Sequence, residues 1–212
     1  MGHVILLGDS IFDNAAYVRG GPDVVKQLQR RLPTDWKASL RAVDGAVTRG
    51  VASQLSRLPS DATHLVVSAG GNDALGASHV LGQSVASVAE AVSLLETAQR
   101  RFAADYEAMV DGVAALRLPT ALCTIYDTPP SEPDQRIIRT ALAVFNDVIT
   151  RAAFARGLPL IDLRLICDED EDYANPIEPS VHGGEKISAA IARFVSGTSG
   201  PQARSIVIAG EA

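Results

Sequence analysis

The sequence is poor in several residue types that mark specialised classes of protein. Only two of its 212 residues are cysteines, Cys123 and Cys167, which is too few for a disulfide framework or a cysteine-rich metal site. Both cysteines lie in apolar surroundings, so we expect buried free thiols. No apolar run approaches the ~20 residues of a membrane span. The 19 basic residues are outnumbered by 25 acidic ones, and the net charge of −6 argues against nucleic acid or an anionic membrane as partner.

The remaining composition is that of one globular domain with a sizeable core, because 47% of the residues are hydrophobic and 21% are charged. We expect a single domain over residues 1–198, with 199–212 forming a tail or an edge strand. No basic segment precedes the first apolar run, which favours a cytoplasmic protein without a signal peptide. We expect no cofactor and no metal, and a small-molecule partner. The oligomeric state stays open.

Strand-like and helix-like segments alternate along the chain. Short apolar runs bounded by turn residues predict strands near residues 4–7, 36–43, 64–68, 121–126 and 158–163. Helical periodicity predicts helices over 22–32, 48–58, 84–118 (as two helices), 134–156 and 184–195, with an acidic loop at 168–179. This alternation predicts an α/β fold, a doubly wound parallel sheet with helices on both faces.

Three predicted strands end in small or polar residues, and parallel strands bring such ends to one edge of the sheet. Ser10 follows the first strand and is placed to act as a nucleophile whose own N–H faces the same reacting atom. Gly45 follows the second strand and brings a backbone N–H close, since it has no side chain. Asn72 follows the third and offers an amide donor. Together these residues indicate acyl transfer, although Asp9 or Ser10 alone is also a common helix cap.

These residues resemble the signature of the SGNH/GDSL hydrolases. The stretch Gly8-Asp9-Ser10-Ile11 is similar to the family's nucleophile block, with Ile11 in place of the usual Leu, and Gly70-Gly71-Asn72-Asp73 is similar to its G-x-N-D block. The resemblance implies a flavodoxin-like three-layer α/β/α sandwich around a five-stranded parallel sheet. It also implies ester hydrolysis, with Ser10 as the nucleophile and with the Ser10 N–H, the Gly45 N–H and Asn72 forming the oxyanion hole.

The last block of the signature departs from the family pattern, which reads D-G-x-H-P before a glycine-led final helix. Here Asn175 stands where the Asp belongs and Glu178 where the His belongs, while His182 comes four residues later. Three interpretations remain open. His182 reaches Ser10 from the start of the last helix, since four residues span about 6 Å of helix. Alternatively, Glu178 is the base, with a pKa raised by burial and an acid-shifted optimum. In the third, catalysis is residual or lost.

A hypothesis from a different class is a non-catalytic protein that binds an acyl or carbohydrate ligand in the same pocket. Unchanged turnover after Ser10→Ala would favour it over the enzyme. A nucleotide-binding protein is disfavoured, because the chain has neither the G-x-G-x-x-G spacing nor a Walker loop. The sequence does not indicate which ester is cleaved.

Overall fold

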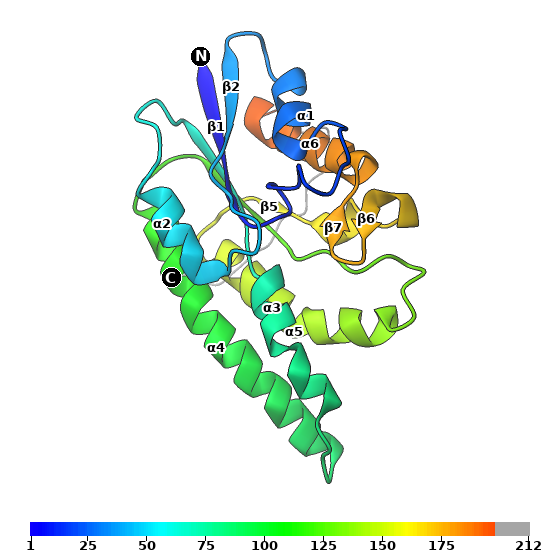
Figure 1. The fold of residues 1–212 in the computed structure, drawn as a ribbon. Coiled ribbons are helices and arrows are strands. Elements are labelled where there is room, and N and C mark those ends of the chain that lie inside the picture. The colour runs from blue at the N-terminus through cyan, green and yellow to red at the C-terminus, as the bar shows by residue number, and fades with distance from the viewer. Residues whose placement is uncertain (198–212) are drawn as a thin grey trace.

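A five-stranded parallel sheet forms the centre of the computed structural model, which describes residues 1–197 (Figure 1). The expected tail or edge strand at 199–212 lies outside the described residues. The strands are β1 (Gly2–Gly8), β2 (Trp36–Leu40), β3 (His64–Ser68), β4 (Thr120–Cys123) and β5 (Leu160–Ile161), in the order β2-β1-β3-β4-β5. Every neighbouring pair in this sheet is parallel. The predicted fold class is therefore confirmed.

Two helical layers cover the sheet because successive side chains of a strand point to opposite faces. On β1, Val4 and Leu6 pack against helices α1 (Val24–Arg31) and α6 (Val181–Ser196). Ile5 and Leu7 point the other way, into the core shared with α2 (Val51–Leu55), α4 (Val88–Ala114) and α5 (Gln135–Ala155). Both faces are buried, as is usual for parallel sheets.

The segment predicted as two helices over residues 84–118 is a single helix of 27 residues, α4. Its start is set by Ser87, whose side chain accepts a hydrogen bond from the Glu90 N–H, as an N-cap does. Its buried residues begin only at Phe102, so the first half extends beyond the sheet (Figure 1). The prediction was wrong because the exposed first half contains no glycine or proline to break it.

Two further elements were not predicted. Helix α3 (Gly71–Ala77) and the 3₁₀ turn η2 (Ser78–Gly82) follow β3 and project in the same direction as the first half of α4 (Figure 1). The acidic loop expected at 168–179 contains one short 3₁₀ turn and an antiparallel hairpin of β6 (Tyr173–Asn175) and β7 (Glu178–Pro179). The other 3₁₀ turns are η1 (Thr48–Gly50), η3 (Leu163–Leu165) and η4 (Asp170–Asp172).

The two cysteines are buried free thiols, as predicted. Burial raises the pKa of the Cys167 thiol to about 12, so it is not a reactive thiolate. Within residues 1–197, no helix is both long enough and apolar enough to cross a membrane.

Candidate active site

Ser10 lies in a tight turn directly after β1, at the carboxyl edge of the sheet. Gly8 has a φ of +122°, and a Cβ there would lie 1.6 Å from the Ser68 carbonyl oxygen, so only glycine fits. The Asp9 N–H donates to that carbonyl at 3.1 Å, and the Phe12 N–H donates to the Asp9 carbonyl at 3.2 Å. These contacts hold Ser10 in a buried but accessible position, lining a cavity of about 250 Å³.

Gln54 supports this turn from α2, a role that the sequence analysis missed. Its Oε1 accepts from the Gly8 N–H and its Nε2 donates to the Gly8 carbonyl, both at 2.8 Å. The side chain is buried, so this pair of hydrogen bonds is shielded from water. The signal in the sequence was a glutamine next to the apolar face formed by Val51 and Leu55.

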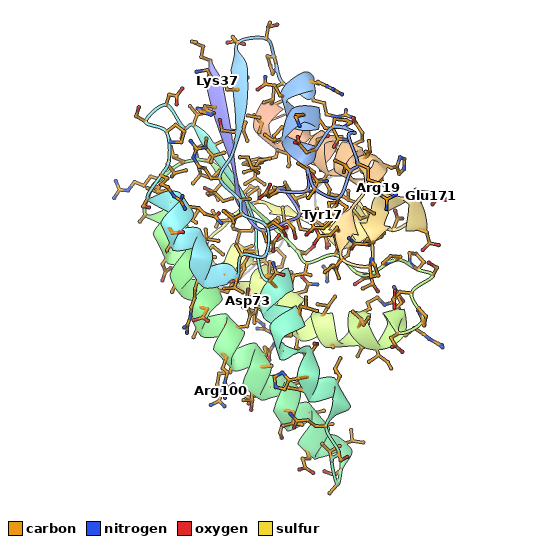
Figure 2. All side chains as sticks on the ribbon, in the orientation of Figure 1. Tyr17, Arg19, Lys37, Asp73, Arg100 and Glu171 are labelled. Atoms are coloured by element: carbon orange, nitrogen blue, oxygen red, sulfur yellow. The ribbon has the colours of Figure 1, made fainter. Side chains whose placement is uncertain are left out.

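Asn72 lies in the first turn of α3 and contacts the loop that contains Gly45. Its Nδ2 donates to the Ala46 carbonyl at 3.0 Å, which leaves the second amide hydrogen free for another acceptor. The neighbouring Asp73 accepts from the Thr48 N–H at 2.8 Å and from the Thr48 hydroxyl at 2.9 Å. The loop after β2 is thus tied to the start of α3, near the sheet edge where Figure 2 labels Asp73.

Two backbone donors at this edge are unused. Within the described chain, the N–H groups of Ser10 and Gly45 donate to no acceptor. Gly45 has a φ of +75°, a conformation that favours glycine. Ser10 lines the cavity, whereas Gly45 does not. Unpaired N–H donors of this kind can stabilise an oxyanion when they point at it.

Glu178 lies on β7 and lines the same cavity as Ser10 and Asn72. Its side chain is buried, with only 4% of the residue exposed, and within residues 1–197 its Oε2 has no hydrogen-bond partner. Burial raises the pKa of Glu178 to about 7. A hydrogen bond that the Ser10 hydroxyl donates to the carboxylate lowers this pKa, and the negative charge of Asp44 raises it. Glu178 is therefore a carboxyl group beside Ser10 that ionises near neutral pH.

A second buried carboxyl group, Asp9, lines the cavity next to Ser10. Burial raises the pKa of Asp9 to about 7. The hydrogen bond from the Ile11 N–H lowers this pKa, and the negative charges of Glu178 and Asp73 raise it. Two carboxyl groups that influence one another titrate as a pair.

The β6–β7 hairpin that contains Glu178 is held by two side chains from elsewhere in the chain. The Tyr126 hydroxyl donates to the Ile177 carbonyl at 2.8 Å, and Asn14 Nδ2 donates to the Pro179 carbonyl at 3.2 Å. Asn14 also accepts from the Val24 N–H at 3.0 Å, joining the hairpin to α1. The contact between Asn14 and Pro179 has no local signal in the sequence, because the two residues lie 165 positions apart.

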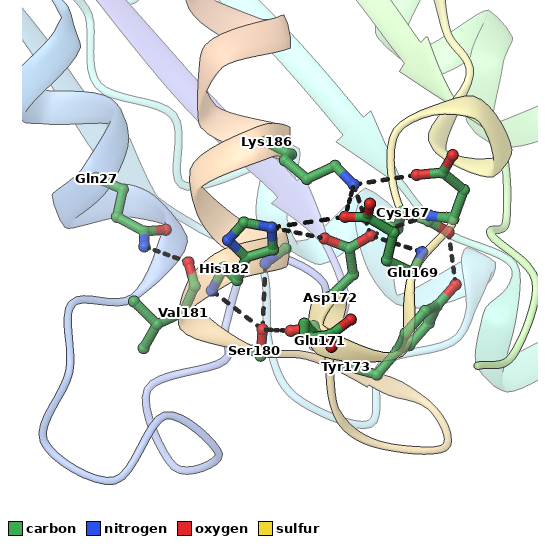
Figure 3. A network of polar contacts seen from close by, with 12 residues as sticks. Gln27, Cys167, Glu169, Glu171, Asp172, Tyr173, Ser180, Val181, His182 and Lys186 are labelled. Carbon is green, nitrogen blue, oxygen red and sulfur yellow. Dashed lines mark hydrogen bonds and ion pairs between the residues drawn. The ribbon is translucent and has the colours of Figure 1, made fainter. Parts of the chain in front are cut away.

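His182 is not brought to Ser10. It lies in the first turn of α6, behind the Ser180 cap, and its Nε2 is 3.8 Å from oxygens of both Glu169 and Asp172 (Figure 3). Its side chain is 58% exposed and does not line the cavity. Asn175, which stands at the position of the family's Asp, accepts a hydrogen bond from the Ile177 N–H within the hairpin turn.

The cluster around His182 also has the composition of a metal site, since ligand atoms of Glu169, Asp172 and His182 lie within 4.8 Å of one another. However, Lys186 Nζ lies 2.7 Å from Asp172 Oδ2 and 3.3 Å from Glu169 Oε2 (Figure 3). The lysine ammonium thus supplies the positive charge that these carboxylates need.

The sequence matches the model of the GDSL-like lipase/acylhydrolase family over residues 6–187. This chain belongs to that family. At the level of the family, the membership indicates a hydrolase of ester bonds. A comparison with curated protein sequences gave no match.

Solved structures of GDSL-type proteins and esterases share the fold. An extracellular lipase from Streptomyces rimosus superposes with a TM-score of 0.65 at 15% identity, covering 94% of this chain and 100% of that one. The psychrotrophic esterase EstA from Pseudoalteromonas sp. superposes with a TM-score of 0.62 at 18% identity, covering 93% of this chain and 98% of that one. A G-D-S-L family member from Veillonella parvula DSM 2008 superposes with a TM-score of 0.68 at 14% identity, covering 92% of this chain and 99% of that one.

Within this GDSL-like chain, the structure brings Ser10, Asn72 and Glu178 to one cavity and ties the Gly45 loop to Asn72. It places His182 in a separate polar network. Of the two bases that the sequence left open, only Glu178 shares the cavity with Ser10.

Proposed function

We propose that this protein hydrolyses carboxylic esters through an acyl-enzyme on Ser10, with Glu178 as the general base. The observation that carries the proposal is the buried Glu178 carboxyl in the cavity of Ser10, with a pKa of about 7. A base is most effective when its pKa lies near the working pH, and burial brings this carboxylate there.

In the first half-reaction, the Ser10 Oγ attacks the ester carbonyl carbon while its proton passes to the Glu178 carboxylate. The carbonyl oxygen becomes an oxyanion, which accepts hydrogen bonds from the Ser10 N–H, the Gly45 N–H and the free amide hydrogen of Asn72. The bond to the alcohol oxygen then breaks, and the protonated Glu178 returns its proton to the leaving alcohol. The products are the free alcohol and an ester of Ser10.

In the second half-reaction, Glu178 removes a proton from a water molecule that attacks the Ser10 ester. The oxyanion forms in the same position, and its collapse breaks the bond between the acyl carbon and the Ser10 Oγ. Glu178 returns its proton to this Oγ, so the products are the carboxylic acid and the restored Ser10 hydroxyl.

The test is hydrolysis of p-nitrophenyl acetate between pH 4 and 9 by the wild type, Ser10→Ala, Glu178→Gln and His182→Ala. Ser10→Ala should fall to background, and Glu178→Gln should lose roughly 10²- to 10⁴-fold in kcat, the usual contribution of a general base. His182→Ala should stay within about twofold of the wild type, since surface changes away from the site have small effects.

The pH profile adds an independent readout. Glu178 accepts a proton only when ionised, so kcat/KM should rise with pH along a limb centred near 7. An ordinary, unshifted carboxylate base would put this limb about two to three units lower.

If His182→Ala lost its activity while Glu178→Gln kept the wild-type activity, the proposed role of Glu178 would be overturned. Equal background rates in all four proteins, for every ester tried, would instead favour a binding protein.

A further inference from the structure

The cavity at Ser10 continues from the sheet edge into a wall of apolar side chains. This wall comes from helices that extend beyond the sheet, α3 with η2, α4 and α5 (Figure 1). Its larger members are Leu75, Leu81, Leu95, Ile138, Leu142 and Phe145. Leu75 and Leu81 remain about half exposed, at 51% and 45%. An open apolar cavity that starts at the nucleophile gains stability when an apolar chain fills it.

The charges at the cavity exclude anionic ligands. The carboxyl groups that line it are those of Asp9, Asp127, Glu132 and Glu178, and within residues 1–197 no Lys or Arg lines it. A phosphate, a sulfate or a long carboxylate would therefore find no counter-charge here. A neutral chain of methylene groups meets no such penalty.

The position of the wall relative to the catalytic groups distinguishes the two sides of an ester. Leu75 follows Asn72 by three residues on α3, so the two side chains share one face of that helix. The wall thus begins beside the oxyanion donor. The leaving alcohol must lie beside Glu178, which returns the proton to it.

We propose that this cavity binds the acyl chain of the substrate, and that the protein prefers neutral esters of medium-length, unbranched acids. The cavity volume of about 250 Å³ sets the length. An apolar protein cavity of about 150 Å³ holds benzene with its six carbon atoms, so this one has room for about ten, and the ester group at Ser10 takes part of that space. The preferred acyl chain is therefore about six to eight carbons long. This inference rests on the proposed function of Ser10.

The experiment compares kcat/KM for p-nitrophenyl esters from acetate to palmitate. Each added methylene should raise kcat/KM about threefold up to six to eight carbons, after which the rate should level off or fall. A parallel series of acetate esters with lengthening alcohols should show no comparable rise. A rise in the alcohol series alone would overturn the assignment to the acyl side.

Two variants with matched controls test the wall. Ala141→Phe fills the cavity and should lower kcat/KM for the octanoate at least tenfold while leaving the acetate within about threefold. Ala143→Phe changes an exposed residue of the same helix that does not line the cavity, and should keep the wild-type profile. Leu81→Asn should weaken the preference for the octanoate over the acetate, and it should leave the core packing unchanged because Leu81 is exposed. Leu116→Asn changes a similarly exposed leucine away from the cavity and should leave the preference for the octanoate unchanged.

Calorimetric titration of Ser10→Ala with p-nitrophenyl octanoate and acetate separates this inference from the proposed function. Tighter binding of the octanoate, lost in Ser10→Ala/Ala141→Phe, supports the acyl cavity even if the wild type hydrolyses no ester. Ser10-dependent hydrolysis with a flat chain-length profile, unchanged by Ala141→Phe, overturns the acyl cavity and leaves the esterase proposal standing.

Discussion

Asp9 and Glu178 are carboxyl groups that burial makes unlike those on the surface. Each is less than 5% exposed, and the pKa of each is raised to about 7. At the residue scale, this shift gives Glu178, which stands where the family signature has a histidine, a pKa close to that of an imidazole. The cause is desolvation, which penalises the charged form more than the neutral one.

Asp44 allows this electrostatic argument to be tested without touching the cavity. Its charge raises the pKa of Glu178 and, through a 2.8 Å hydrogen bond, helps to raise that of Tyr17 to about 12. Asp44→Asn removes the charge and keeps the shape, so the pKa of Glu178 should fall. The acid limb of kcat/KM should then move to lower pH, by less than about one unit because Asp44 is exposed to screening solvent.

The measurement is the pH profile with p-nitrophenyl acetate at low ionic strength. Asp35→Asn serves as control, since Asp35 is an exposed aspartate paired with the N-terminus. A limb that stays in place, or that moves to higher pH, would contradict the assignment of this limb to Glu178.

At the scale of elements, the short β6–β7 hairpin decides where Glu178 points. Two residues of β7 alone contribute little stability, so the hairpin depends on Tyr126 and Asn14 for its position. Tyr126 also packs against Tyr173 of β6, with ring centroids 5.1 Å apart.

Tyr126→Phe keeps this ring packing and removes the hydrogen bond to the Ile177 carbonyl. Losing such a bond costs about 1 kcal/mol of unfolding free energy. We expect kcat to fall on the order of tenfold, with little change in KM, because Glu178 is less well positioned. Tyr106→Phe is the matched control: within residues 1–197 its buried hydroxyl has no partner, so stability and kcat should not fall. Equal kcat values for Tyr126→Phe and the wild type would show that the hydroxyl does not position Glu178.

For the whole molecule, the raised pKa of Asp9 links folding to pH. The folded protein keeps a proton on Asp9 up to about pH 7, whereas the unfolded chain releases it near pH 4. The contribution of Asp9 to stability is thus fully present below about pH 4 and is lost as the pH rises through 7. Between pH 5 and 8 this loss amounts to about 3 kcal/mol.

Asp9→Asn should abolish this loss, since the amide stays neutral and still accepts from the Ile11 N–H. Urea unfolding at pH 5 and at pH 8 would measure this loss. Titrations of groups that do not interact with Asp9 cancel when the variant is compared with the wild type. The variant should gain stability relative to the wild type as the pH rises. A difference between the two proteins that is the same at both pH values would mean that Asp9 is ionised in the folded state throughout.

Sequence alone was enough for the features that depend on local pattern. The strand–turn–helix alternation predicted the parallel sheet, because periodicity and turn residues are properties of neighbouring positions. Gly8 ends β1, Gly70 closely follows β3 and Gly45 lies in the loop after β2. Each has a positive φ that glycine adopts without strain. The placement of Ser10 and Asn72 at one edge followed from parallel topology.

Only the tertiary structure showed that Glu178 shares the cavity with Ser10 and that His182 does not. The two residues are four positions apart, but Ser180 caps α6 between them. The Glu178 side chain extends from β7 into the cavity, whereas the His182 side chain points from α6 toward Glu169 and Asp172. The direction of Glu178 depends on the hydrogen bonds of Tyr126 and Asn14 to the hairpin. Both residues are distant in sequence, and so no local pattern encodes this direction. The cavity likewise arises where Leu75, Leu95 and Leu142 meet from three separate helices, and its size is a property of their packing.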